Sequence, residues 1–230
     1  INLLEDGVYN RGNKVSLGKQ GLNGWIWALI SLDAAETVIP EGSYYSRKDI
    51  IIEILKQQNS DGGFSLYGET SDSDITANAV TALSRYFTDN FQYNYINQKT
   101  GKSETKSVKA ALEEALLFLS EIQLSDGGFA SGGVENCESS SQVLLALCSM
   151  GIDPISDGRY IKNGNTVIDN VLSFKNMDGG FSHVIGMPSN SYASDQAALG
   201  LIAADRFFKN DSSIFSFSID TVSYTHLTLP

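Results

Sequence analysis

The tetrapeptide Asp-Gly-Gly-Phe occurs three times in the chain, each time after an amphipathic stretch. The copies begin at Asp61, Asp126 and Asp178. Two adjacent glycines can adopt positive φ without a Cβ penalty, so they can end a helix and reverse the chain. The aspartate can bond to backbone amides of the turn, and the phenylalanine can return to the core. We therefore expect each copy to be a turn between two packed helices, with no catalytic role for its aspartate.

Two kinds of helix flank these turns. The stretches before them carry apolar residues at helical spacing on one face only, which is typical of an outer helix; they cover residues 46–58, 107–123 and 165–174. The stretches after them are rich in Ala, Leu and Ser and almost uncharged in the middle, which indicates burial on most sides. These inner stretches cover residues 74–87, 138–150 and 192–208, and residues 23–36 are one more. The sequence predicts an all-α chain of repeated outer–inner helix hairpins.

One domain is expected over residues 1–221, with a single insertion at residues 88–106. An alternating Phe-Gln-Tyr-Asn-Tyr segment and a Lys-Thr-Gly-Lys turn predict a small β-hairpin in this insertion. Residues 222–230 share no pattern with the rest and resemble translated adapter sequence, so this tail and its His226 are excluded as artefactual. The chain begins at Ile1 without Met, and we expect a fragment of a parent chain with further domains.

Composition and charge exclude several kinds of partner. Hydrophobic side chains make up 42% of the 230 residues, which is enough for a packed core. The formal net charge of −11 repels phosphate backbones, so we expect no nucleic-acid partner. No apolar run approaches the roughly 18 residues of a membrane span, so we expect no membrane insertion.

Three segments carry a family resemblance that covers most of the chain. Residues 57–64, 72–83 and 118–129 resemble the Gln-to-aromatic repeats of the squalene–hopene cyclase and protein prenyltransferase superfamily, although the third copy has Lys175 in place of Gln. The resemblance implies a partial α/α toroid (an α/α barrel) with a central cavity. Residues 151–174 are similar to secreted or surface proteins of Gram-positive bacteria, which implies an extracellular or cell-surface location. The same toroid occurs in intrinsic factor and transcobalamin, which adds a cobalamin-like ligand to the candidates.

A partial match to the cyclase acid motif lies at the start of one inner stretch. The cyclases use the middle Asp of Asp-X-Asp-Asp-Thr-Ala, and this chain has Asp72, Asp74, Thr76 and Ala77 with Ile75 in place of the last Asp. Protonating an alkene requires a strong, pre-organised acid, and the loss of a hydrogen-bonding neighbour weakens that role. Asp72 and Asp74 are therefore the candidate catalytic residues, and capping of a helix N-terminus is the simpler interpretation.

A zinc site of the prenyltransferase kind is incomplete. Glu135-Asn136-Cys137 stands where those enzymes have an Asp-X-Cys pair, but the later histidine would fall near Tyr192 and Ala193. Catalytic zinc needs three protein ligands. We expect no metal and no certain cofactor.

Two polar rows appear when the inner stretches are aligned on their Ala-Leu or Gly-Leu pairs. One row is Thr76, Ser140 and Ser194, and the other is Asn78, Gln142 and Gln196. Residues two apart on a helix face about 200° apart, so only one row can face a cavity. Either both rows only bond between helices, or one row lines a polar ligand site. Further residues would complete such a site: Trp25, Trp27, Glu138, His183, Tyr192 and Asp195.

These features favour a non-catalytic domain that binds a small molecule, cobalamin-like or of another mid-sized class. The alternative is a terpenoid cyclase or prenyltransferase-type enzyme that acts on isoprenoids, and a purely structural or adhesive repeat is a third. An aromatic tunnel ending at Asp74 would favour the enzyme, because aromatic rings stabilise carbocations. A wide bowl lined by amides and hydroxyls would favour the binder.

Overall fold

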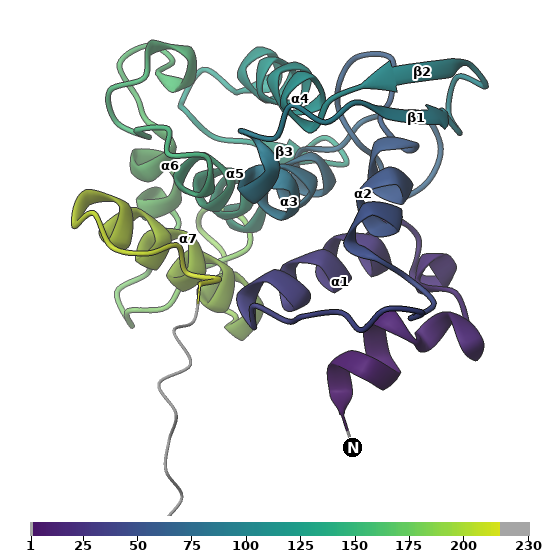
Figure 1. Cartoon of the computed structure of the whole chain (residues 1–230). Helices are drawn as coiled ribbons and strands as arrows, with labels where there is room; N and C mark the ends of the chain where they lie inside the picture. The colour runs from purple at the N-terminus through teal and green to yellow at the C-terminus, as the bar shows by residue number, and fades with distance from the viewer. Residues whose placement is uncertain (1, 217–230) are drawn as a thin grey trace, which may run out of the picture.

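The computed structural model describes residues 2–216, and the 222–230 tail with His226 lies outside the described residues (Figure 1). Within the described part about half of the chain is helical and a small β-hairpin is present, as the sequence predicts. The inner helices are α1 (Leu22–Ala34), α3 (Ser73–Leu83), α5 (Cys137–Ser149) and α7 (Ser191–Phe208). The outer helices are α2 (Arg47–Leu55), α4 (Val108–Ile122) and α6 (Val167–Ser173).

The remaining elements are short. The insertion forms β1 (Tyr93–Ile96) and β2 (Ser103–Lys106), which pair antiparallel, and the middle turn forms β3 (Ala130–Ser131) and β4 (Val134–Glu135). Single helical turns cover Glu5–Tyr9, Arg11–Asn13, Leu17–Gln20, Ser84–Tyr86 and Gly158–Tyr160. No described helix combines the length and the apolar character needed to cross a bilayer.

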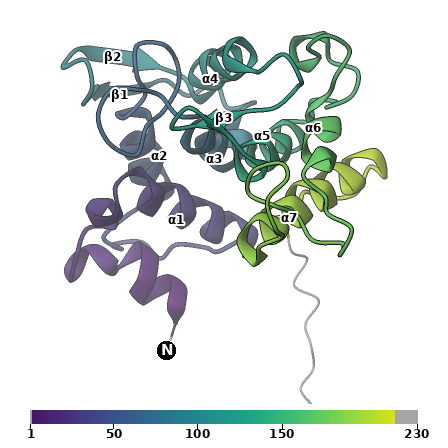
Figure 2. The same ribbon diagram turned by 180° about the vertical axis from the view of Figure 1, so that it is seen from behind.

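The inner helices lie side by side in chain order and point in the same direction. Each packs against the next, and α2, α4 and α6 pack against α1, α3 and α5 respectively (Figure 1; from behind in Figure 2). The second residue of every inner helix lines one concavity, whereas the last turns of α1, α3 and α5 line a different cavity. Four parallel helices therefore present their N-terminal ends to the same side of the molecule.

Helix starts differ between the two layers. Outer helices begin at a Ser or Thr cap: Ser46, Ser107 or Thr166 accepts a hydrogen bond from an amide of the first turn. Three inner helices begin instead at an Asp or Asn, whose side chains also cap strongly. These polar residues set where each helix starts, and so they fix which later residues share a face.

The three glycine turns have the predicted form. The first glycine of each pair has φ between 85° and 88°, and the preceding aspartate accepts a hydrogen bond from the amide of the second glycine. The side chains of Phe64, Phe129 and Phe181 are buried in the core between the helices. Each such ring is worth roughly 1.5–3 kcal/mol of burial, so the motif both ends one helix and anchors the next.

Each of the first two glycine turns is attached to the outer layer by a buried glutamine. Gln58 Nε2 donates to the carbonyls of Gly62 and Ala111, both at 2.8 Å. Gln123 Nε2 donates to those of Gly127 at 2.8 Å and Tyr160 at 3.0 Å. In the third copy Lys175 occupies this position and is exposed. The first two turns are thus bonded to the segment that follows them in the outer layer.

The β-hairpin lies against the first turn. Asn97 Nδ2 donates to the Gln58 carbonyl at 2.9 Å, and Lys106 Nζ lies 2.7 Å from Glu114 Oε2 of α4. The hairpin thus covers the outer side, beside α2 and α4, and none of its residues lines the concavity at the inner-helix N-termini.

Candidate functional site

The N-terminal ends of the inner helices surround a concavity of about 710 Å³. Small-molecule sites typically enclose about 300–1,000 Å³, so the volume suits a mid-sized ligand. The second residue of each helix lines it: Asn23, Asp74, Glu138 and Tyr192. Because all four occupy the same place in their helices, they form one polar layer at the mouth.

A second layer lies one helical turn deeper. Residues four apart on a helix share a face, and Asp74, Glu138 and Tyr192 are followed at this spacing by Asn78, Gln142 and Gln196. All three amides line the concavity, and Gln142 Nε2 donates to Gln196 Oε1. The floor of the concavity is therefore a row of side-chain amides, one from each of three neighbouring helices.

Two acceptors around the concavity lack a partner. Gln142 Oε1 and Asn23 Oδ1 are buried atoms with no hydrogen bond to any described residue. Leaving a buried polar atom unpaired costs about 1–3 kcal/mol. A ligand would recover that free energy if the two side chains turned these oxygens toward the concavity and the ligand donated hydrogen bonds to them.

The hydroxyl row points elsewhere. The oxygens of Thr76, Ser140 and Ser194 accept hydrogen bonds, 2.8 to 3.0 Å long, from backbone amides of the preceding turns, which belong to Phe64, Phe129 and Phe181. Ser140 also donates to Asn170 of α6 at 2.7 Å. Thr76 and Ser140, both candidate ligand-binding residues, thus hold the glycine turns onto the inner helices and do not line the concavity.

Each segment after a turn packs over the N-terminal end of the preceding inner helix. Ser73 of α3 donates to the Ala130 carbonyl at 3.0 Å, and the Cys137 amide of α5 donates to the His183 carbonyl at 3.1 Å. This placement brings Ser131, Val134 and His183 to the edge of the concavity. His183 Nδ1 lies 2.8 Å from Glu138 Oε2, so the imidazole and the carboxylate are hydrogen-bonded.

The two carboxyl groups of the mouth have different surroundings. Burial raises the pKa of Asp74 above its ordinary value, and the nearby carboxyls of Asp72 and Glu138 raise it further, against the opposing effect of neighbouring serine hydroxyls. Glu138 is 7% exposed and is bonded to His183. Burial thus makes the charged form of Asp74 less favourable than it is in water, whereas Glu138 is held by a hydrogen bond to the imidazole.

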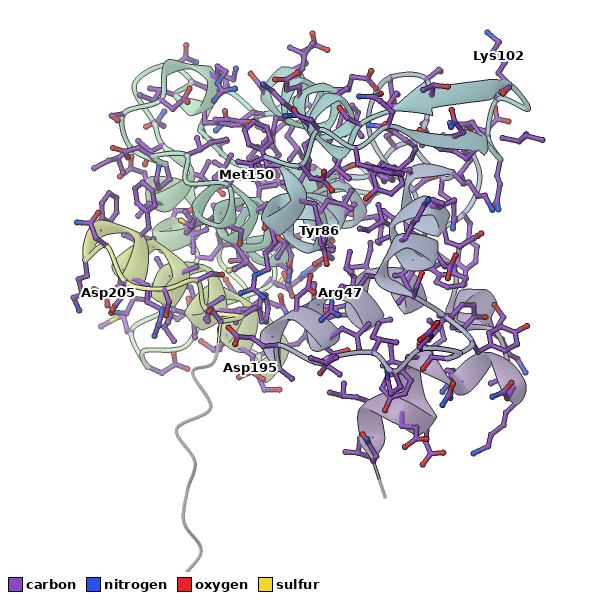
Figure 3. The ribbon with its side chains drawn as sticks, in the orientation of Figure 1. Arg47, Tyr86, Lys102, Met150, Asp195 and Asp205 are labelled. Atoms are coloured by element: carbon purple, nitrogen blue, oxygen red, sulfur yellow. The ribbon has the colours of Figure 1, made fainter. Side chains whose placement is uncertain are left out.

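Several predicted residues lie away from the concavity. Asp72 caps α3, where its carboxylate accepts from the amides of Asp74 and Ile75. Trp25 is buried against Tyr45, with ring centroids 5.2 Å apart. Trp27 is exposed beside a separate hollow. Asp195 is exposed on the first turns of α7 and does not line the concavity (Figure 3).

Other lining residues were not among the predicted ones. Asn23, Asn136 and Asn190 contribute amides, and Ser131, Ile75 and Val134 complete the lining. Counting from the caps of the inner helices would have found Asn23, because it stands at the same helical position as Asp74 and Glu138. Ser131 and Val134 belong to the β3–β4 turn, whose position no sequence pattern indicated.

The incomplete zinc motif has a structural role. Cys137 is fully buried, its sulfur lies 3.9 Å from the Ser141 hydroxyl, and burial raises the pKa of its thiol to about 11. Asn136 caps α5 through the Ser139 amide. Across residues 2–216, no cluster of three or more His, Cys, Asp and Glu side chains is arranged to hold a metal ion.

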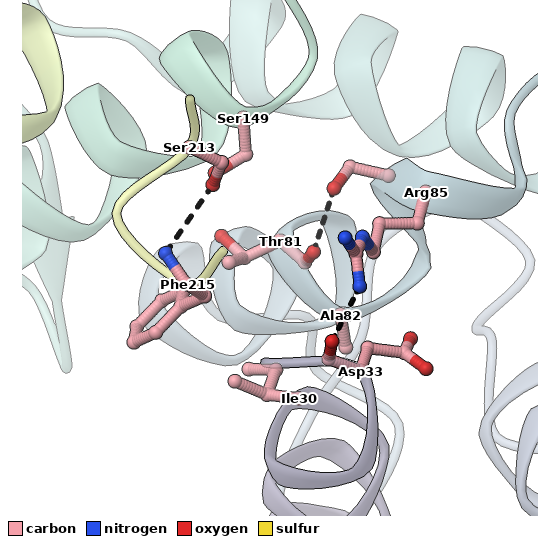
Figure 4. A pocket seen from close by; sticks show the side chains of 9 residues that line it. Ile30, Asp33, Thr81, Ala82, Arg85, Ser149, Ser213 and Phe215 are labelled. Atoms are coloured by element: carbon pink, nitrogen blue, oxygen red, sulfur yellow. Dashed lines mark hydrogen bonds between the residues drawn. The ribbon is translucent and has the colours of Figure 1, made fainter. Parts of the chain in front are cut away.

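A smaller cavity of about 90 Å³ lies at the opposite end of the inner helices. Arg85 donates to the Asp33 carbonyl there, while the Asp33 carboxylate accepts from Arg47 at 2.8 Å and from Tyr86 (Figure 4; Arg47 and Tyr86 are labelled in Figure 3). Arg47 and Asp33 form an ion pair, and the bond from Arg85 to the Asp33 carbonyl fits a structural connection between α1 and α3.

No protein-family model matches the sequence, and no curated protein is significantly similar to it. Function is therefore inferred from the chemistry of the concavity.

Proposed function

We propose that this chain is a non-catalytic domain that binds a mid-sized polar molecule in the concavity at the N-terminal ends of its inner helices. The observation that carries the proposal is the amide floor of Asn78, Gln142 and Gln196, together with the unpaired oxygen of Gln142. Buried polar atoms are normally hydrogen-bonded. An unpaired acceptor in a concavity of ligand size is the arrangement expected of a site that its ligand completes.

We further propose that the hairpins belong to an α/α toroid of the cyclase and prenyltransferase repeat type, carried by an exported bacterial protein. Support for the toroid comes from the parallel, neighbouring inner helices with outer helices packed behind them. The cell-surface location rests on the sequence resemblance alone. Cobalamin stays among the candidate ligands because binders with this toroid take it.

The alternative is an isoprenoid cyclase or prenyltransferase, and one observation favours it. Asp74 lines the concavity, and its raised pKa suits a proton donor. Against it, Tyr192 is the one aromatic side chain among the described residues that line the concavity. A carbocation would find little π-stabilisation there.

The test uses the side-chain NH₂ signals of Asn78, Gln142 and Gln196 in ¹H–¹⁵N spectra. Cyanocobalamin, cobinamide, squalene, farnesyl diphosphate and a set of neutral sugars are added in turn. We expect one of the polar probes to shift these signals without being consumed, and Gln142→Ala to weaken its binding. Gln57→Ala, which removes an amide beyond the end of α2, is the matched control and should bind normally. Turnover of squalene or farnesyl diphosphate that Asp74→Asn abolishes would establish the enzyme instead.

A further inference from the structure

The hydrogen-bonding groups of the concavity call for a ligand rich in donors. Gln142 Oε1 and Asn23 Oδ1 are buried and unpaired, and Glu138 adds a carboxylate at the mouth. The amide of Asn78 can both donate and accept. A ligand that fits this set must offer several O–H or N–H groups and accept a few bonds in return.

The charges of the concavity argue against ionic ligands. No Lys or Arg is among the described lining residues, and two carboxyl groups stand at the mouth. Phosphates and carboxylates would meet repulsion without a compensating cation. A polyamine would have to compete with His183 for the Glu138 carboxylate.

The apolar part of the lining is small. It consists of Ile75, Val134 and the ring of Tyr192, and that ring is 65% exposed. A long hydrocarbon would leave the amide row buried and unpaired, at a cost of about 1–3 kcal/mol for each group. A single exposed ring at the mouth can instead pack against the C–H face of a compact ligand.

We infer that the ligand is a neutral saccharide. Its hydroxyls donate to the Glu138 carboxylate and, once the side chains of Gln142 and Asn23 turn toward the concavity, to their oxygens. They accept from the amides of Asn78 and Gln196, while Tyr192 packs on the face of a sugar ring. This inference rests on the proposed function, since it names the chemical class of the ligand for the same concavity.

The experiment titrates the ¹⁵N-labelled chain with cellobiose, maltotriose and N,N′-diacetylchitobiose. Spermidine and glucose 6-phosphate serve as the cationic and the anionic comparison. We expect at least one neutral saccharide to shift the side-chain NH₂ signals of Asn78, Gln142 and Gln196. Gln142→Ala should weaken its binding about tenfold, the equivalent of roughly 1.4 kcal/mol. Gln196→Ala, on the less buried α7, provides a second variant, and Gln57→Ala should leave binding unchanged.

The outcomes separate the two levels of the proposal. If none of the three saccharides shifts these signals but spermidine or glucose 6-phosphate does, the saccharide inference is wrong and the proposed binding function stands. If no probe of any class shifts these signals at concentrations that would detect a Kd of about 1 mM, the saccharide inference and the proposed binding function are both wrong. A saccharide that binds equally well to wild type and to both amide variants would also overturn the inference.

Discussion

The first and third glycine turns share a polar arrangement that the middle turn lacks. In the first, Asn59 Nδ2 donates to the Ser71 hydroxyl at 2.8 Å, and Ser71 donates to Asp61 at 2.6 Å. In the third, Asn176 Nδ2 donates to the Ser189 hydroxyl at 2.9 Å, and Ser189 donates to Asp178 at 2.8 Å. Both arrangements close within one turn and its following loop.

The middle turn replaces the asparagine by Leu124 and the serine by Glu135. The Glu135 carboxyl accepts from Asn170 of α6 at 2.7 Å, and the nearby carboxyl of Asp126 adds to the effect of burial in raising its pKa. Asn170 in turn accepts from the Ser140 hydroxyl of α5 at 2.7 Å. The side-chain hydrogen bonds around the turn aspartate are thus local in the first and third copies, whereas in the middle copy they reach the neighbouring outer helix.

The largest expected difference is between Gly127→Ala and Gly179→Ala. Both glycines have φ near 87°, at 87° and 88°, where alanine costs about 1–2 kcal/mol. A Cβ on Gly127 would also lie 2.5 Å from the backbone oxygen of Thr166, whereas one on Gly179 would meet nothing within 4 Å. Overpacking adds about 1–3 kcal/mol, so we expect Gly127→Ala to cost about 2–5 kcal/mol and Gly179→Ala about 1–2 kcal/mol. Urea unfolding followed by circular dichroism measures both, and equal losses would show that the middle turn is not held against α6.

The second difference concerns the residue three positions before each aspartate. Gln123→Leu leaves the carbonyls of Gly127 and Tyr160 without their donor, and we expect the free energy of unfolding to fall by about 1–3 kcal/mol. Lys175→Leu in the third copy changes an exposed side chain and should stay within about 0.5 kcal/mol. Chemical denaturation of both variants gives the comparison. A large loss for Lys175→Leu would mean that the third turn depends on a contact of that lysine.

The helix pairs were predictable because their cause is local. The Asp-Gly-Gly-Phe copies and the two kinds of apolar pattern locate α2 to α7, and the alternating segment at residues 91–95 with its lysine-flanked turn indicates the hairpin. What sequence could not supply was the partner of each polar side chain. Glu135 meets Asn170 only because α6 packs beside the middle turn, and no periodicity encodes that contact.

The candidate site was predictable in part. The amides Asn78, Gln142 and Gln196 emerged from the alignment of the inner stretches, but the choice between this row and the hydroxyl row needed the turns in place. The hydroxyl oxygens of Thr76 and Ser140 already accept hydrogen bonds from backbone amides eleven or twelve residues earlier in the chain. Trp27 stands at the helical position of the amide row in α1, and because its side chain carries no amide the row does not continue there.

A smaller effect is expected where the two local arrangements are disrupted alike. Ser71→Ala and Ser189→Ala each remove one hydroxyl that links an asparagine to the turn aspartate. A hydrogen bond of this kind contributes about 0.5–1.5 kcal/mol, so both variants should lose about 1 kcal/mol. Urea unfolding of the two variants side by side is the measurement. Losses that differ by more than the value of one hydrogen bond would show that the first and third turns are not equivalent.

The smallest expected effect distinguishes the middle turn by its pH dependence. Burial, together with the hydrogen bond and the negative charge of Asp126, raises the pKa of Glu135 above its ordinary value, and Asn170 opposes this only in part. The folded state therefore binds a proton more tightly than the unfolded chain, and stability is lost as the pH rises from the ordinary pKa of a glutamate through the raised value.

Glu135→Gln keeps a neutral group in place, so it should stabilise the chain at neutral pH by less than about 1 kcal/mol, since this carboxyl is partly screened by solvent. The gain should vanish in acid, below about pH 4, where Glu135 is protonated in both states. Glu121→Gln, which changes an exposed glutamate of α4, is the control for the loss of one negative charge. A gain from Glu135→Gln that grows toward low pH would show that the ionised carboxylate, held by Asn170, is the form that the middle turn prefers.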